Sequence, residues 1–173
     1  MIVLPDILEP GLKVVFCGTA VGTVSARKGA YYAGPGNRFY DVLFSVGLTP
    51  RRLDPTEYAT LPQYGIGLTD LAKHTAGADK SLHIIDFDSD ALRWKIRMNA
   101  PRALAFNGKR AAQEFYGHKV ELGRQPQRIG ETAVFVVSST SGLAVRFWEQ
   151  SYWQALADFV NSTENREPSQ PSS

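Results

Sequence analysis

The sequence predicts an α/β fold in which helices cover both faces of a mostly parallel sheet. Three apolar runs suit strands that are buried on both faces, at residues 12–18, 102–107 and 133–137. Helical patterns lie between these runs, and such alternation is typical of parallel sheets. With 173 residues, the chain is long enough for one continuous core. We expect a single domain over residues 1–160 and a disordered polar tail over 161–173, which has no apolar residue.

The elements of the first half follow from local signals. The first strand breaks into a glycine-bounded turn, and a loop with two neighbouring tyrosines follows it. Asn37 can cap a helix to about Val46, which Gly47 would stop. Next we expect a short helix at 55–61 and a short strand or turn at 65–70.

The second half shows three helical stretches. Asp88 or Ser89 can cap a helix that ends near Asn99, just before a proline. Two further helices are expected at 109–116 and at about 146–160. The last of these has three large apolar residues on one face: Trp153, Leu156 and Val160.

The composition narrows the class of protein. No apolar run approaches the ~18 residues of a membrane span, and the start of the chain has no secretory pattern, so we expect a soluble cytoplasmic protein. The single cysteine, Cys17, excludes an internal disulfide and a four-cysteine metal site, and it suits a small buried hydrophobe. The histidines show no metal-ligand spacing: His74, His83 and His118. We assign no metal and no cofactor.

The charges are unevenly distributed. Residues 93–128 contain nine Lys or Arg and two acids, whereas residues 49–90 contain four Lys or Arg and seven acids. This asymmetry allows a basic surface for a phosphate backbone, and it is equally compatible with solvated helix faces. Charge alone therefore does not identify the partner.

Small residues follow two of the predicted strands. The first strand is followed by the turn at 18–22 and by the loop at 31–39, which contains Tyr31 and Tyr32. The last strand is followed by the run 138–143. Open α/β sheets bind ligands at the carboxyl ends of their strands. Backbone N–H groups and flat aromatic faces at this edge suit a planar ligand with polar edges, such as a nucleobase.

Three segments together resemble a known family. The runs 6–18 (DILEPGLKVVFCG), 35–39 (PGNRF) and 141–143 (SGL) are similar to the mismatch-specific uracil/thymine-DNA glycosylases of the uracil-DNA glycosylase superfamily, and the similarity extends over about 6–160. It implies a three-layer α/β/α sandwich around a four-stranded parallel sheet. It also implies a monomer, acting on DNA at the nucleoid of a bacterial cytoplasm, that flips a damaged or mismatched nucleotide into a pocket and cleaves its N-glycosidic bond.

The resemblance assigns residues to the base pocket. Tyr32 falls where an aromatic stacks on the flipped base. The base edge would meet the turn that begins at Gly18, and four further residues are candidates for contact with it: Thr19, Ala20, Ser25 and Asn37. Asn37 is equally well explained as a helix cap.

The resemblance also assigns a DNA-contacting loop after the last strand. Gly142 and Leu143 fall on a wedge that fills the gap left in the base stack. Ser139 and Ser141 are expected to hold a phosphate. Arg146 is expected either to reach a phosphate or the opposite base, or to be solvated.

The sequence departs from the family at its first motif. The family has Gly-Ile-Asn-Pro-Gly, whose asparagine positions the attacking water, and this chain has Gly-Thr-Ala-Val-Gly at 18–22. Ala20 stands in place of the asparagine and cannot hold a water. In the second motif, Asn-Pro-Ser-Gly-Leu becomes Ser-Thr-Ser-Gly-Leu at 139–143. Asp70, expected at the carboxyl end of a neighbouring strand, is our candidate for the missing catalytic role. The alternative is that Asp70 caps a turn or pairs with Lys73.

Three functions remain in competition. The leading hypothesis is a monofunctional DNA glycosylase that removes uracil, with some breadth towards hypoxanthine or thymine, and so initiates base excision repair. The second is a non-catalytic binder of mismatched or abasic DNA, which the loss of the asparagine favours. The third is an α/β hydrolase of nucleosides or nucleotides.

Overall fold

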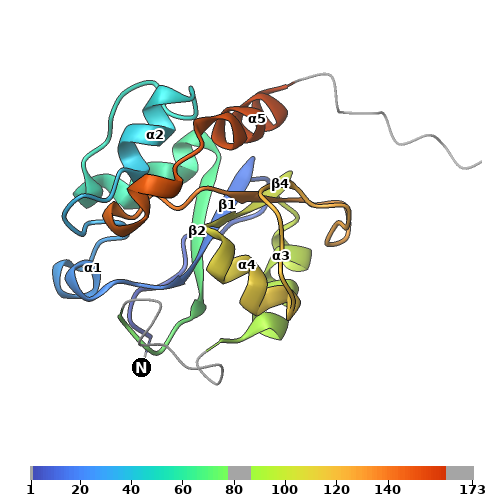
Figure 1. Ribbon diagram of the computed structural model, residues 1–173, viewed down its shortest axis with the longest axis horizontal. Helices are drawn as coiled ribbons and strands as arrows, with labels where there is room; N and C mark the ends of the chain where they lie inside the picture. The colour runs from blue at the N-terminus through green and yellow to red at the C-terminus, as the bar shows by residue number, and fades with distance from the viewer. Residues whose placement is uncertain (1, 78–86, 163–173) are drawn as a thin grey trace, which may run out of the picture.

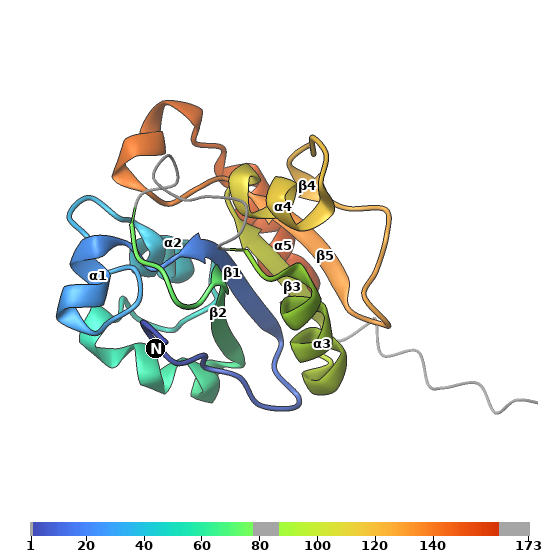
Figure 2. The ribbon, with the colours of Figure 1, turned by 90° about the horizontal axis from the view of Figure 1, so that it is seen from below.

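A five-stranded sheet forms the centre of the computed structural model, which describes residues 2–77 and 87–162 (Figure 2). The strand order is β2–β1–β3–β5–β4. The first four of these are parallel: β1 (Val14–Ala20), β2 (Ile66–Ala72), β3 (Ala103–Asn107) and β5 (Ala133–Val137). The fifth, β4 (Gly123–Arg124), is antiparallel to β5. The expected four-stranded sheet is therefore wrong by one strand, because two residues carry no strand pattern.

Helices cover both faces of this sheet (Figure 1). In this view α2 (Phe39–Ser45) and α5 (Gln150–Asn161) lie on one side, and α3 (Ser89–Asn99) and α4 (Lys109–Tyr116) lie on the other. The remaining helical elements are short: α1 (Thr23–Lys28) and the 3₁₀ helices η1 (Pro55–Tyr64) and η4 (Gly142–Phe147). The predicted last helix thus begins later than expected, because η4 is a separate turn. Most of the predicted tail lies outside the described residues, and Asn161 is the last residue of α5.

Two hydrophobic clusters, one on each face, hold the layers together. Alternation along β1 sends Phe16 towards α2 and α5, where it stacks on Trp153 with ring centroids 5.2 Å apart. Cys17 points to the other face and is fully buried, as the sequence predicts. Because both faces of the sheet are covered, polar groups on these strands can reach solvent only at the strand ends.

The outer edge of β2 is protected by the segment that precedes β1. Ile7 forms an isolated antiparallel bridge with Leu68, through two backbone hydrogen bonds of 2.9 Å. This pairing covers an edge that would otherwise be open. It also fixes the neighbouring Asp6 beside the end of β2.

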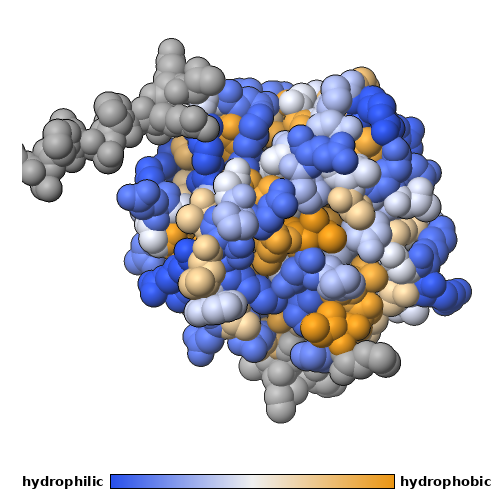
Figure 3. Space-filling model, turned by 180° about the vertical axis from the view of Figure 1, so that it is seen from behind, coloured by the Kyte–Doolittle hydropathy of each residue, from blue (hydrophilic) through white to orange (hydrophobic). Residues whose placement is uncertain are grey.

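One face of the molecule can be described by its hydropathy. Seen from behind, polar residues dominate and hydrophobic residues gather in separate patches (Figure 3). In the described part of the chain, the helices are too short and too polar to cross a membrane.

Candidate active site

Three residues lie side by side near the carboxyl ends of adjacent strands: Asp70 of β2, Gly18 of β1 and Asn107 of β3. We call these three residues the row. Gly18 of β1 is in register with Asp70 of β2, and the β1–β3 register pairs the residues just before Gly18 and Asn107. Alternation places all three on the face that carries Phe16, which is the face covered by α2 and α5. The predicted position of Asp70 at the end of a neighbouring strand is thereby confirmed.

Asp70 faces the open backbone of Gly18. A Cβ atom at Gly18 would lie 3.3 Å from Asp70 Oδ1 and 3.5 Å from the Tyr32 hydroxyl. The Asp70 side chain is only 3% exposed. Burial raises the pKa of this carboxyl above its ordinary value, although Lys73 acts in the opposite direction. A buried carboxylate beside a bare backbone is suited to chemistry on a bound ligand.

Lys73 links Asp70 to a second acid. Its ammonium group donates to Asp70 Oδ2 (3.1 Å), to Asp6 Oδ1 (2.9 Å) and to the Tyr31 hydroxyl (2.9 Å). An ammonium has three N–H donors, so all of them are used. Burial raises the pKa of Asp6, but its bonds to Lys95 (2.6 Å) and Lys73 outweigh this and hold it below its ordinary value. The pairing of Asp70 with Lys73, which was the alternative to a catalytic role, therefore exists, and it leaves Asp70 Oδ1 facing Gly18.

Tyr32 covers this row from the loop after α1. Its backbone is left-handed (φ +55°), and its ring stacks on Phe39 with centroids 4.0 Å apart. Its hydroxyl is buried and has no hydrogen-bond partner among the described residues. Burial raises the pKa of Tyr32 well above its usual range, and the nearby Asn107 side chain acts in the opposite direction. A buried hydroxyl without a partner is rare and indicates a place where a ligand atom can bind.

The tyrosine loop is held from two sides. The Ser25 hydroxyl accepts a hydrogen bond from the Ala33 N–H (2.9 Å), and the Tyr40 hydroxyl donates to the Tyr31 carbonyl (2.7 Å). Ser25 is 5% exposed, so its hydroxyl fixes the loop that carries Tyr32. These bonds support the strained backbone of Tyr32.

The remaining predicted base contacts, Thr19, Ala20 and Asn37, differ in where their side chains lie. Thr19 lies on the opposite face of β1, is 8% exposed, and can reach the row only through its backbone. Ala20 ends β1 on the same face as Gly18, in register with Ala72. The Asn37 side chain accepts from the N–H of Phe39, the first residue of α2 (3.0 Å), while the N-cap residue itself is Arg38, which makes no side-chain cap bond.

Asn107 is a site residue that sequence reasoning missed. Its carboxamide is fixed by two bonds to Thr140: Nδ2 donates to Oγ1 (3.0 Å), and Oδ1 accepts from the backbone N–H (3.1 Å). The available signal was its place at the end of the predicted strand 102–107. Its importance follows only from the strand register.

The 139–147 loop follows β5 and includes η4. It presents three exposed apolar side chains: Leu143 (85%), Val145 (54%) and Phe147 (70%). Its base is tied to the molecule, because Thr140 also accepts from the Arg38 N–H (3.0 Å). A Cβ atom at Gly142 would lie 3.2 Å from the Gly36 carbonyl oxygen, so the two loops approach closely.

Hydroxyl groups order the tip of this loop. The Ser139 hydroxyl accepts from the Ser141 N–H, and the Ser141 hydroxyl accepts from the Leu143 N–H, each at 3.2 Å. Neither hydroxyl donates a hydrogen bond to another residue in the part of the chain that the structure describes, so both protons can be donated to an anion.

Three cations lie in or near the loop: Arg38, Lys109 and Arg146. The Arg38 guanidinium lies 4.3 Å from the centre of the Trp148 ring, and its Nε and Nη2 atoms are buried without partners among the described residues. No ion pair within the described ranges involves Arg38, Lys109 or Arg146. Unpaired cations next to exposed apolar groups are typical of surfaces that bind nucleic acid.

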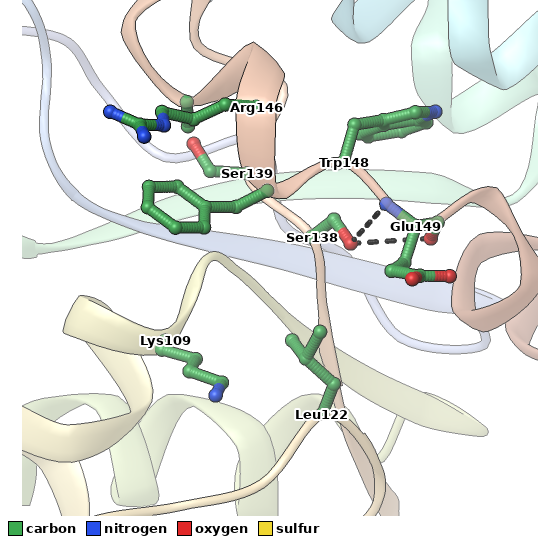
Figure 4. A pocket seen from close by; sticks show the side chains of 9 residues that line it. Lys109, Leu122, Ser138, Ser139, Arg146, Trp148 and Glu149 are labelled. Carbon is green, nitrogen blue, oxygen red and sulfur yellow. Dashed lines mark hydrogen bonds between the residues drawn. The ribbon is translucent and has the colours of Figure 1, made fainter.

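A cleft of about 610 Å³ lies beside the same loop (Figure 4). Lys109 of α4 and Leu122 form one wall, and Ser139 with Arg146 and Trp148 belong to the other. None of Gly18, Tyr32, Asp70 and Asn107 lines it. Within residues 2–77 and 87–162, no group of His, Cys, Asp or Glu is placed to hold a metal ion.

Comparison with known proteins identifies the class. Residues 5–159 match the Uracil DNA glycosylase superfamily, and the chain belongs to this superfamily. A solution NMR structure described as a "putative Uracil DNA glycosylase", from Methanosarcina acetivorans, has a similar fold. It is 21% identical, the match covers 92% of this chain and 97% of that one, and the TM-score is 0.62.

Proposed function

We propose that this protein is a monofunctional DNA glycosylase that flips uracil out of DNA, cleaves its N-glycosidic bond and so initiates base excision repair. The observation that carries the proposal is the buried Asp70 carboxylate, which faces Gly18 beneath the unpartnered Tyr32 hydroxyl. Membership of the superfamily supplies the reaction class. The resemblance to mismatch-specific relatives favours uracil opposite guanine as the substrate.

In this proposal the row of strand ends binds the base. The base lies against the face of Tyr32 that Phe39 does not cover, and its polar edge meets the Asn107 carboxamide and the backbone N–H groups after Gly18. As the N-glycosidic bond breaks, negative charge develops on the base, and these fixed donors stabilise it. Recognition through backbone and stacking also tolerates other bases, so we expect slower excision of hypoxanthine or thymine.

Asp70 replaces the catalytic asparagine of the family, whose position is occupied here by Ala20. The sugar becomes cation-like at C1′ as the base leaves, and a buried carboxylate stabilises that charge. The same carboxylate orients or deprotonates the attacking water. Lys73 is unsuited to act as an amine nucleophile, because its three donors are already used. The reaction therefore ends at an abasic site.

The 139–147 loop is the proposed DNA contact. Leu143 would enter the base stack in place of the flipped nucleotide. Ser139, Ser141, Arg146 and Arg38 would hold phosphates on either side of it.

The test is single-turnover cleavage of a uracil·guanine duplex and of a uracil-containing single strand. We expect wild type to leave alkali-labile abasic sites and Asp70→Asn to be slower by ~10² or more. The matched control is Asp90→Asn, which changes an exposed acid on α3 and should not alter the rate. An undiminished rate in Asp70→Asn would reject the role of Asp70.

A second candidate is a non-catalytic binder of mismatched or abasic DNA. It is favoured by Ala20, which leaves the motif without its water-binding amide. This alternative would be established if the wild-type protein binds the duplex but cleaves none of the tested bases from it.

A further inference from the structure

We propose that a second copy of this chain docks on the exposed side of α3, so that the protein forms a weak two-fold dimer. The surface involved takes no part in the proposed reaction. The resemblance to the glycosylase family implies a monomer, whereas the side chains on this side of α3 point to a pair.

The outer side of α3 carries a stripe of exposed residues. They are spaced at i, i+4, i+7 and i+8, so they share one side of the helix: Asp90, Trp94, Arg97 and Met98. Trp94 is 65% exposed and Met98 is 62% exposed. The other side of the helix buries Leu92 and Ile96 against the sheet. We call the four exposed residues the α3 stripe.

The composition of the α3 stripe is typical of a protein interface. Trp, Met and Arg are enriched at interfaces, and a central tryptophan commonly carries a large share of the binding energy. α3 lies at the far side of the molecule from the 139–147 loop (Figure 2), and it packs on the face of the sheet opposite Phe16. A partner on the stripe therefore leaves the row and the proposed DNA contact open.

The charges of the stripe identify a second copy as the partner. Within residues 2–77 and 87–162, Asp90 and Arg97 have no ion-pair partner. Asp90 is four residues before Trp94, and Arg97 is three residues after it. With a rise of ~1.5 Å per residue, the two charges lie about 6 Å and about 4.5 Å from Trp94 along the helix, in opposite directions.

Two such stripes are complementary when the helices pack antiparallel across a two-fold axis at Trp94. The axis brings Arg97 to within about 1.5 Å of the level of the partner's Asp90 along the helix. Two ion pairs then flank a central contact between the two Trp94 rings. A two-fold interface uses the same patch on both copies, and this stripe meets that requirement. One helix from each copy buries less surface than a permanent dimer does, so we expect a micromolar dissociation constant.

Sedimentation equilibrium of the full chain, from low micromolar to submillimolar concentration, tests the dimer. We expect wild type to dimerise and Trp94→Ser to dimerise at least ~10-fold more weakly, because the central aromatic is lost from both copies. The matched control is Phe44→Ser, which removes another exposed aromatic, on α2, and should dimerise as wild type does. A wild type that stays monomeric, or a dimer that Trp94→Ser does not weaken, would overturn the proposal.

Charge reversal tests the two-fold arrangement. Arg97→Asp and Asp90→Arg each place like charges opposite one another, so each variant alone should dimerise at least ~10-fold more weakly than wild type. An equimolar mixture of the two variants, one of them fluorescently labelled, restores both pairs of opposite charge. We therefore expect a heterodimer of about the wild-type affinity, which a loss of folding could not produce. A mixture that associates as weakly as each variant alone would overturn the antiparallel arrangement.

These outcomes are independent of the proposed reaction. Each copy carries a complete row, so the rate of uracil excision per copy should be the same in wild type and Trp94→Ser. If wild type excises uracil but stays monomeric, only the dimer fails. If wild type dimerises through the stripe but excises nothing, the proposed function fails and the dimer stands.

Discussion

At the scale of single residues, Asp70 lowers the stability of the fold at neutral pH. Its pKa is higher in the folded state than its ordinary value of 3.8, so the folded protein binds this proton more readily than the unfolded chain does. The stability gained from protonation of Asp70 in the folded state is fully present below pH 3.8. It is lost as the pH rises through the folded pKa, so that it is absent at neutral pH. A buried carboxyl group that destabilises the fold at neutral pH is typical of a functional site.

The same shift predicts the pH dependence of excision. The ionised carboxylate is the active form in the proposed mechanism, so the single-turnover rate should fall as the pH decreases through the pKa of Asp70. The midpoint should lie above 3.8, because burial raises this pKa. A pH–rate profile with uracil-containing DNA measures it. Asp70→Asn should lack this decrease, and an identical decrease in the variant would assign it to another group.

The ion pair between Lys73 and Asp70 predicts that removal of Lys73 destabilises the fold. Lys73→Met leaves the Asp70 carboxylate buried without its ion-pair partner, which typically costs about 3–5 kcal/mol of the free energy of unfolding. Urea denaturation at neutral pH measures this loss. The double variant Lys73→Met/Asp70→Asn should recover part of it, because the unpaired charge is gone. Additive losses would show that the two side chains are not coupled.

At the scale of elements, the sequence predicts best where turn residues bound an apolar or amphipathic run. The helix predicted at 109–116 agrees with α4, which lies between Gly108 and Gly117. The strand predicted at 133–137 agrees with β5. The two-residue β4 and the short α1 have no such pattern and were missed.

The site was predictable in part for a related reason. Gly18 and Asp70 each end an apolar run, so their convergence follows from parallel strands. Asn107 ends such a run as well, but its role depends on the register of β1 with β3 and on two bonds to Thr140. Those contacts join segments that are far apart in sequence, and no local pattern specifies them.

The edge of β2 gives a prediction at this scale. A Cβ atom at Gly67 would lie 2.6 Å from the Ile7 carbonyl oxygen and 2.7 Å from Leu12 Cδ1. Gly67→Ala should therefore separate the bridge between Ile7 and Leu68 and destabilise the protein by about 1–3 kcal/mol. Thermal unfolding measures the loss. Gly34→Ala is the control, because nothing lies within 4 Å of its Cβ position. Equal stability of the two variants would contradict the prediction.

At the scale of the whole molecule, Asp6 connects parts that are distant in sequence. It accepts from Lys73 after β2, from Lys95 on α3 and from the Thr69 hydroxyl (2.8 Å). Through Lys73 it also reaches Tyr31, whose hydroxyl donates to the Pro5 carbonyl (3.0 Å). The segment before β1 thus ties the tyrosine loop, the end of β2 and α3 to one charge cluster around the proposed catalytic carboxylate.

Asp6 and Asp70 contribute to stability with opposite signs, and this makes Asp6→Asn informative. The pKa of Asp6 is lowered on folding, so its contribution is present above pH 3.8 and is lost as the pH falls through its folded pKa. Asp6→Asn should lose about 2 kcal/mol at neutral pH, since hydrogen bonds to charged groups are broken, and little at low pH. Urea denaturation across this range measures the difference.

The same variant should also shift the pH dependence of catalysis. The Asp6 charge raises the pKa of Asp70, and its removal leaves Lys73 with fewer competing acceptors. The acid decrease in the excision rate should therefore move to lower pH in Asp6→Asn, whereas removing the Lys73 charge should move it to higher pH. An unchanged midpoint in Asp6→Asn would mean that the segment before β1 supports the fold without setting the protonation of the site.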